Sequence, residues 1–164
     1  MSVVCDILFE DSRWGERVDA EKLVHEVVAK VIEVTRRDVH PDAEASFIFA
    51  NDERIKSLNA QWRNKDAPTN VLSFPTSVGS ELHKAPLLGD VILAYETIER
   101  ESIDEEKPFA HHAAHMMVHG FLHLVGFDHQ NDTEAAAMEL IESEVLLKLG
   151  LPDPWADDRL TEEV

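Results

Sequence analysis

Six of the nine histidines in the chain fall within the nineteen residues of 111–129. His119 and His123 lie four residues apart in a stretch whose apolar pattern predicts a helix, so both imidazoles should share one face, about one turn apart. A left-handed turn at Gly126 would let His129 approach the same point from the following loop. Three histidines bind zinc and leave a fourth position open for water, as catalytic zinc sites do. We therefore predict one zinc ion, held by these three histidines and used for hydrolysis.

The other histidines of this segment fit a metal site less well. His115 shares the predicted helix face, but it lies eight positions and about 12 Å along the axis from His123. Two Zn–N bonds of about 2.1 Å do not easily bridge that distance. We interpret His115 as a neighbour that orients His119 or meets the substrate, and as one candidate general base. His111 and His112 are expected to be exposed residues of the first helical turn.

The residue after the first predicted ligand narrows the chemistry. Zinc proteases with the spacing H-x-x-x-H-x-x-G-x-x-H carry Glu there as the general base, whereas this chain has Gly120. A peptidase or amidase is therefore disfavoured. Zinc can still lower the pKa of its bound water toward about 7 and polarise a phosphoryl oxygen. Asp128, beside the last predicted ligand, is the second candidate base, or it orients an imidazole.

A second group of polar residues lies in 58–75, LNAQWRNKDAPTNVLSFP. Arg63 ends a predicted helix and enters a loop, where its guanidinium can bind a phosphate through two parallel hydrogen bonds and stabilise developing charge. Asn70 and Ser73 offer further polar contacts to a substrate. Taken alone, the segment fits better an Arg63 that only caps its own helix and a Ser73 that only fills a strand.

Together these segments resemble the YbeY family of bacterial metal-dependent, single-strand-specific endoribonucleases. The resemblance rests on three motifs: APTNVLSFP at 67–75, LGDVILA at 88–94 and HGFLHLVGFDH at 119–129. It covers about residues 46–149 and implies zinc on the three predicted ligands, with Arg63 as the family's key arginine near the metal. It also implies 16S rRNA 3′-end maturation, ribosome quality control and contact with the small ribosomal subunit and its assembly factors. Phe127 stands where the family commonly has Tyr, and Asn70 where Asp is also frequent.

The rest of the sequence predicts the elements that position these groups. Strands are predicted at 3–9, 45–50, 71–74 and 89–95, and helices from Asp19, from Asn51 or Asp52 to about Trp62, from about Glu96, over 108–125 and over 132–149. Residues 76–88 are expected to be irregular. The continuous apolar run at 89–95 indicates burial on both faces. Four strands and five helices make an α+β fold with the zinc site at the end of the long central helix, and the resemblance adds that the strands form a small mixed sheet flanked by helices.

Length and composition fit a single such domain. The chain has 164 residues, 44% hydrophobic and 29% charged, with one cysteine, Cys5. We expect one domain over 1–150 and an acidic tail over 151–164 that frays. The single cysteine and the lack of a secretory or membrane-length apolar run favour the cytoplasm. The net charge of −18 argues mildly against nucleic acid binding, so an RNA substrate would need an offset from the metal, the basic residues at 54–65 or a partner.

Other functions remain open from the sequence. A non-catalytic ribosome-assembly factor with a structural zinc is one, although an open fourth ligand position argues weakly against it. A metallohydrolase of another class is a second, and a metal carrier is a third. Three imidazoles would also accept nickel, copper or cobalt, so zinc is a preference rather than a requirement.

Overall fold

The computed structural model describes residues 3–77 and 79–156. Its strands and α-helices are, in chain order, β1 (Val4–Phe9), α1 (Ala20–Thr35), β2 (Glu44–Ala50), α2 (Asp52–Arg63), β3 (Val71–Pro75), β4 (Leu87–Ala94), α3 (Tyr95–Asp104), α4 (Phe109–Leu124) and α5 (Asp132–Lys148). Two short 3-10 helices, Ser12–Glu16 and Gly79–Lys84, lie between them. The predicted α+β fold, with four strands and five α-helices, is therefore confirmed.

The four strands form one mixed sheet in the order β1-β2-β4-β3. β1 and β4 both run parallel to β2, whereas β3 runs antiparallel to β4. β4 is thus a central strand, and all its residues from Val91 to Ala94 are buried. This confirms the burial on both faces that the continuous apolar run predicts.

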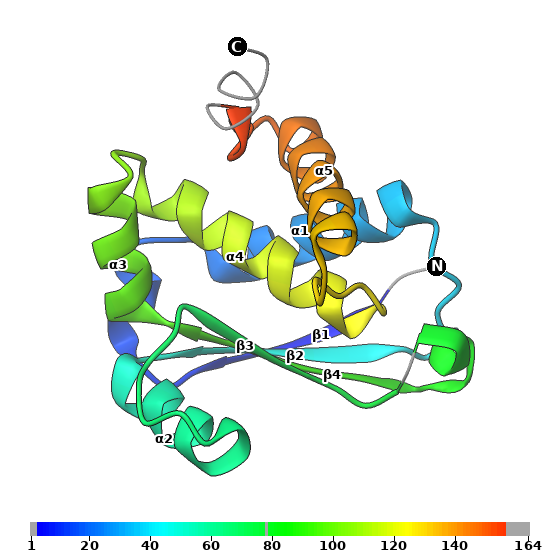
Figure 1. Cartoon of the computed structure of the whole chain (residues 1–164), viewed down its shortest axis with the longest axis horizontal. Helices are drawn as coiled ribbons and strands as arrows, with labels where there is room; N and C mark the ends of the chain where they lie inside the picture. Colours follow the sequence, from blue (N-terminus) through cyan, green and yellow to red (C-terminus); the bar gives the residue numbers. More distant parts are fainter. Residues whose placement is uncertain (1–2, 78, 157–164) are drawn as a thin grey trace.

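The helices are distributed unequally over the two faces of the sheet. Helices α1 and α4 lie against one face, with α5 packed on these two helices, and α2 lies on the side of the other face (Figure 1). The main core includes Phe47 and Val91 of the sheet together with Phe121 of α4. A smaller apolar cluster, with Ile55 and Leu72, lies beneath α2. Helix α4 contacts both β3 and β4, and its residues His119 and His123 line one cleft together with Arg63, Thr69 and Asn70 from the segment that connects α2 to the sheet.

Capping residues set the ends of the helices that lead to the site. The side chain of Asp19 accepts a hydrogen bond at the start of α1, as predicted. Asn51 does the same for α2, so Asn51 rather than Asp52 is the cap. Helix α2 ends at Arg63, and Asn64 then adopts a left-handed conformation with φ of 55°. This reversal starts the loop that returns the chain to β3.

The segment 76–88 is more regular than expected. It contains the 3-10 helix Gly79–Lys84, and β4 begins at Leu87, two residues before the predicted start. The strand passes through Gly89, whose φ of 134° is accessible mainly to glycine. A register shift at Glu44/Ala45 of β2 accommodates this irregularity. The glycine therefore lies within the strand, although the sequence pattern suggests that it begins one.

The first part of the acidic tail, up to Ala156, includes residues that are hydrogen-bonded to α5. The Oδ1 atom of Asp153 accepts hydrogen bonds from the Ser143 hydroxyl at 2.7 Å and from the backbone N–H of Trp155 at 2.8 Å. Residues 157–164 of the predicted tail lie outside the described residues. Within the described part of the chain, no helix is both long and apolar enough to cross a membrane.

Candidate metal centre

The last turns of α4 and the loop after it bring three histidines to one point. His119 and His123 lie on one face of α4, with ring centroids 4.9 Å apart. The chain leaves the helix through Gly126, whose φ is 98°. This left-handed turn returns the chain so that the ring of His129 lies 4.9 Å from that of His123 and 5.3 Å from that of His119. The predicted set of three residues is therefore assembled in space.

The geometry of the three imidazoles fits a tetrahedral metal ion. One nitrogen from each ring lies within 4.8 Å of the other two. Two nitrogens bound to the same tetrahedral zinc at about 2.1 Å would stand about 3.4 Å apart, and the Nε2 atoms of His119 and His123 are 3.3 Å apart. Burial, and then the neighbouring imidazoles, lower the pKa of His123 to about 4. This ring is therefore neutral at pH 7 and can offer a lone pair to a cation.

A buried carboxylate on α5 holds the first of these histidines. Glu142 is 1% exposed, and its Oε2 accepts a hydrogen bond from Nδ1 of His119 at 2.7 Å. An ionised carboxylate only accepts, so Nδ1 carries the proton and Nε2 keeps its lone pair on the side of the other two histidines. Burial raises the pKa of Glu142, but hydrogen bonds from His115 and His119 outweigh it and lower the pKa to about 2. Glu142 is consequently ionised at neutral pH.

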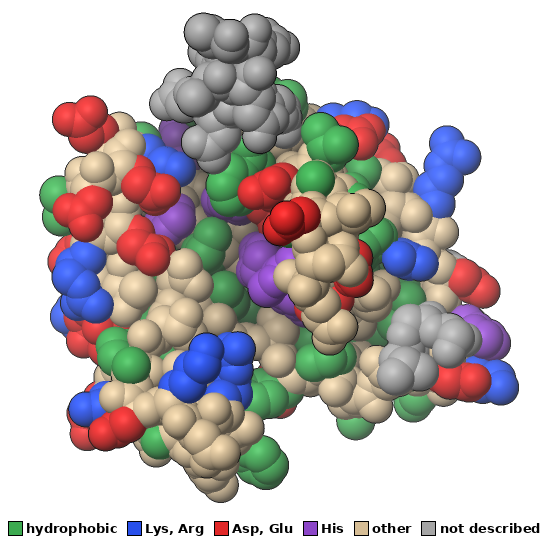
Figure 2. Space-filling model, in the orientation of Figure 1, with side chains coloured by type: hydrophobic (Ala, Val, Ile, Leu, Met, Phe, Trp, Pro, Cys, Tyr) green, Lys and Arg blue, Asp and Glu red, His purple; other side chains and the backbone are tan. Residues whose placement is uncertain are grey.

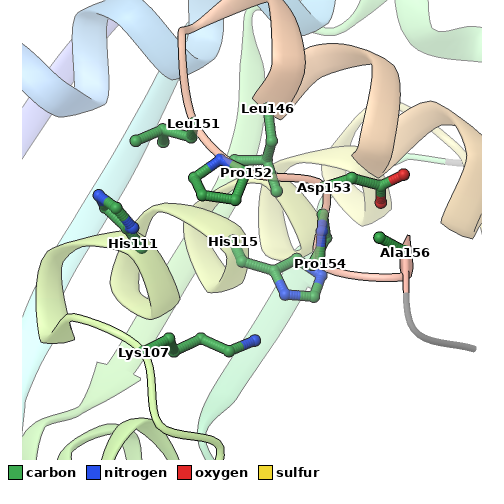
Figure 3. Close-up of a pocket in the computed structure, with 9 residues that line it drawn as sticks. All are labelled: Lys107, His111, His115, Leu146, Leu151, Pro152, Asp153, Pro154 and Ala156. Carbon is green, nitrogen blue, oxygen red and sulfur yellow. The ribbon is translucent and has the colours of Figure 1, made fainter.

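The second oxygen of Glu142 connects two further side chains to the centre. Its Oε1 accepts from Nε2 of His115 at 2.6 Å and from the indole N–H of Trp155 at 3.1 Å. His115 thus acts on His119 through this shared carboxylate. Figure 3 shows His115 extending from α4 to the turn at Pro154, where the C-terminal segment covers it.

Glu142 and Trp155 are absent from the predicted site residues. The sequence does indicate that Glu142 is unusual, because it shares a face of its helix with the apolar residues Met138 and Val145, which are buried. A carboxylate on the apolar face of a helix requires buried partners. Trp155 has no comparable sign, since it follows the last helix in an acidic segment.

The two histidines at the start of α4 differ from their predicted exposure. His112 is 4% exposed, and its Nε2 lies 2.8 Å from Oε1 of Glu101 on α3. The expectation of an exposed His112 is wrong, because α3 packs against α4 at this point. His111 is half-buried and lines a small hollow of about 140 Å³ beneath the C-terminal segment (Figure 3).

An open cleft of about 360 Å³ lies in front of the three histidines. Its walls include all the remaining predicted site residues except His115, namely Arg63, Asn70, Ser73 and Asp128. Figure 2 shows histidine side chains in the hollow at the centre of this face, with Lys and Arg side chains on the α2 side and acidic side chains on the α5 side. The fourth coordination position of a tetrahedral ion held by the three histidines would therefore face an open cleft in which a substrate can lie.

Two of the cleft residues are already engaged in hydrogen bonds. The amide of Asn70 donates to Oε1 of Glu101 at 3.0 Å. The hydroxyl of Ser73 donates to the backbone carbonyl of Gly120 at 2.9 Å and so ties β3 to α4. Both contacts fix the wall of the cleft. Arg63, in contrast, is exposed at the rim.

Comparison with known proteins agrees with this geometry. The family model for endoribonuclease YbeY matches residues 9–150. The chain belongs to this family. An endoribonuclease YbeY from Rhodopseudomonas palustris strain BisA53 is 48% identical over 155 residues, covering 93% of this chain and 90% of that protein. Another, from Bradyrhizobium sp. strain BTAi1, is 43% identical over 156 residues and covers 93% and 92% of the two chains.

A solution structure of a Thermotoga maritima protein has a similar fold. Its TM-score is 0.55 at 23% sequence identity, and the match covers 96% of this chain and 93% of that one. The YbeY match at 9–150 includes the three histidines, Arg63 and Glu142. Trp155 lies beyond it, so the contact between Trp155 and Glu142 is made by a segment outside the matched range.

The position of Gly120 in this YbeY chain explains why the protease base is missing. A Cβ atom at Gly120 would lie 2.6 Å from Cγ1 of Val91 and 3.2 Å from the Ser73 hydroxyl oxygen. The residue therefore faces the sheet, where α4 and β4 approach too closely for a side chain. A glutamate side chain at this position therefore has no room.

Proposed function

We propose that this protein is a zinc-dependent, single-strand-specific endoribonuclease. The observation that supports this most strongly is the convergence of three imidazole nitrogens at an open cleft whose wall carries Arg63. Three neutral ligands leave the full positive charge of a zinc ion available to a phosphate. The relatives named endoribonuclease YbeY support RNA as the substrate.

The proposed mechanism assigns a separate task to each part of the cleft. His119, His123 and His129 would hold zinc, which when bound lowers the pKa of a water molecule and polarises a phosphoryl oxygen. Arg63, at the rim of the cleft, would bind the scissile phosphate through its two parallel N–H donors and stabilise the charge that develops on it. Glu142 would keep His119 in the orientation and tautomer that zinc binding requires.

Of the two candidate bases, Asp128 is better placed than His115. Asp128 is exposed and lines the cleft, while its Oδ1 accepts from the backbone N–H of His129 at 2.8 Å. His115 is 6% exposed, and its Nε2 is bonded to Glu142. A base must reach the proton it removes, directly or through one water. We infer that Asp128 takes the proton of the attacking water and that His115 positions Glu142.

The proposed biological substrate rests on the resemblance to the family. We propose that the enzyme acts in the cytoplasm on precursor 16S rRNA, in 3′-end maturation and ribosome quality control, in contact with the small ribosomal subunit and its assembly factors. Asn70 and Ser73 would shape the wall along which the RNA lies. The domain that performs this function would include residues 151–156 as well as 1–150, because Trp155 bonds to Glu142.

Metal analysis and RNA cleavage by the same preparations test the proposal. Purified wild-type protein is expected to contain one zinc per chain and to cleave a single-stranded RNA oligonucleotide. His119→Ala should lose both the zinc and the cleavage, whereas Arg63→Ala should keep the zinc and lose cleavage. Full cleavage by the metal-free variant would refute zinc dependence.

A chelator separates a catalytic zinc from a structural one. If the zinc is catalytic, chelation abolishes cleavage while the circular dichroism spectrum at 25 °C is retained, and added zinc restores cleavage. A wild-type protein that binds zinc, melts at a lower temperature without it and cleaves no RNA would instead be an assembly factor. Cleavage of a peptide substrate would indicate another class of hydrolase.

A further inference from the structure

A second hollow adjoins the candidate metal centre on the side of α5. It has a volume of about 220 Å³ and is lined by the rings of His119 and His129, by Ala135 and Met138 of α5, and by Trp155. His119 and His129 also line the cleft that contains Arg63. The two hollows therefore meet at the imidazoles that would hold the metal.

The aromatic wall of this pocket is held in place by several contacts. The indole N–H of Trp155 donates to Glu142 at 3.1 Å, and its backbone N–H donates to Asp153 at 2.8 Å. Its ring also meets the ring of His115 at 90°, with centroids 5.6 Å apart. A ligand that contacts the indole consequently finds it already ordered, which lowers the entropy cost of binding.

The size and lining of the pocket suit one small planar group. Sites for drug-sized ligands usually occupy about 300–1,000 Å³, so a pocket of about 220 Å³ holds less than a whole nucleotide. Indole, thioether and methyl groups form much of its wall, from Trp155, Met138 and Ala135. Every nucleobase has a π-face that stacks on an aromatic side chain, whatever its identity.

Charge decides which part of an RNA strand enters. The acidic side chains of Glu139 and Glu142 line the same pocket, and Glu142 accepts hydrogen bonds from the rings of His115 and His119. These carboxylates repel a phosphate, whereas an uncharged base carries no such penalty. Stacking also supplies affinity that does not depend on positive charge, which matters in a chain with a net charge of −18.

We infer that this pocket binds one unpaired nucleobase of the RNA, next to the scissile phosphate, with Trp155 as its stacking surface. The inference rests on the proposed ribonuclease function and adds a base subsite to it. A base within a duplex is stacked and paired, so it cannot enter the pocket without being extruded. The subsite therefore favours single-stranded RNA, and Trp155 is the residue that provides it.

The test combines variants of Trp155 with abasic RNA. A single-stranded RNA oligonucleotide that the zinc-loaded wild type cleaves at one mapped position is prepared with an abasic nucleotide at each position flanking the cut. Loss of one stacked base is expected to raise KM by about 5- to 150-fold at one of these positions, with kcat changed much less. Trp155→Ala should show the same loss with intact RNA and no further loss with the abasic strand.

Two further variants separate stacking from other effects. Trp155→Phe keeps an aromatic ring and loses the N–H, so it should retain most of the affinity. Leu140→Ala changes a residue of α5 that is 60% exposed and does not line the pocket, and its kinetics should match the wild type. Zinc content is measured for every variant, because the indole also bonds to Glu142.

Each result either supports or overturns the subsite. The inference is wrong if, at every abasic position, the rise in KM caused by the abasic nucleotide is the same in Trp155→Ala as in the wild type, so that the two effects are independent. It is also wrong if Trp155→Ala has the wild-type KM for intact RNA. It is also wrong if Trp155→Ala and Trp155→Phe both lose zinc, since the indole would then act on the metal through Glu142. Failure of the wild type to cleave any RNA would instead refute the proposed function.

Discussion

Replacement of Glu142 by glutamine tests how α5 supports the candidate metal centre. The carboxylate accepts two short hydrogen bonds from histidines, 2.6 Å from His115 and 2.7 Å from His119. A glutamine side chain has one acceptor oxygen, and its NH₂ group cannot accept. At least one of the two imidazoles must therefore lose its partner, turn its ring or change its tautomer.

The size of the effect follows from the geometry. Loss of a carboxylate behind a metal-ligating histidine typically weakens metal affinity by about 10- to 100-fold, which is about 1.4–2.7 kcal/mol. The metal-free protein should also become less stable. The pKa of Glu142 is lowered from 4.5 to about 2, which corresponds to about 3 kcal/mol of folding stability above pH 4.5. That stability is lost as the pH falls from 4.5 toward 2, and Glu142→Gln should lack this part of the acid sensitivity.

Competition with a chromophoric zinc chelator at pH 7 measures the affinity, and urea unfolding of the metal-free protein measures the stability. Glu144→Gln is the matched control, because it removes one carboxylate at an exposed position of the same helix, away from the pocket beside the histidines, and leaves both histidine contacts of Glu142 in place. An unchanged zinc dissociation constant in folded Glu142→Gln would refute the assigned role of the carboxylate.

Three further predictions concern other parts of the centre. Lowering the pH from 6.5 toward 4 should destabilise the metal-free protein by up to about 3 kcal/mol. The reason is that the unfolded chain takes up a proton on His123 in this range, whereas the folded state, in which the pKa of His123 is about 4, does not. In His123→Gln, the free energy of unfolding measured in urea should lose this dependence on pH. Gly120→Ala should cost about 1–3 kcal/mol by crowding Val91, whereas Gly15→Ala, which has open space around its Cβ, should cost under about 0.5 kcal/mol in the same urea assay. Arg63→Lys should retain zinc yet lower kcat/KM for RNA by about 10- to 100-fold, because a lysine lacks the paired donors of the guanidinium.

The set of three histidines could be predicted because its geometry is local. Helical periodicity alone places His119 and His123 on one face, and the turn at Gly126 brings His129 back within a few residues. No contact distant in sequence is needed for this step. Helix ends were predictable for the same reason, since a cap such as Asn51 bonds within its own first turn.

The contacts that hold these histidines in place could not be predicted in the same way. Glu142 reaches His119 across 23 positions of sequence, and that contact exists only because α4 and α5 pack together. His112 is buried for a similar reason, through its contact with Glu101 of the neighbouring helix. Sequence spacing carries no information about which helices become neighbours, so the three histidines were predicted as a set, whereas Glu142, which bonds to His119 and His115, was not.

The two sides of the centre carry opposite charges, and on the proposed function this asymmetry orients the RNA. Arg63 lies on the wall formed by the end of α2, and it attracts the phosphate backbone. The α5 side presents Glu139 and Glu142 beside an apolar pocket, which repels phosphate and accepts an uncharged base. A strand laid with its backbone toward α2 and a base toward α5 places a phosphate at the three histidines. The net acidity of the chain is then compatible with RNA binding, because only one wall of the cleft has to meet the phosphates.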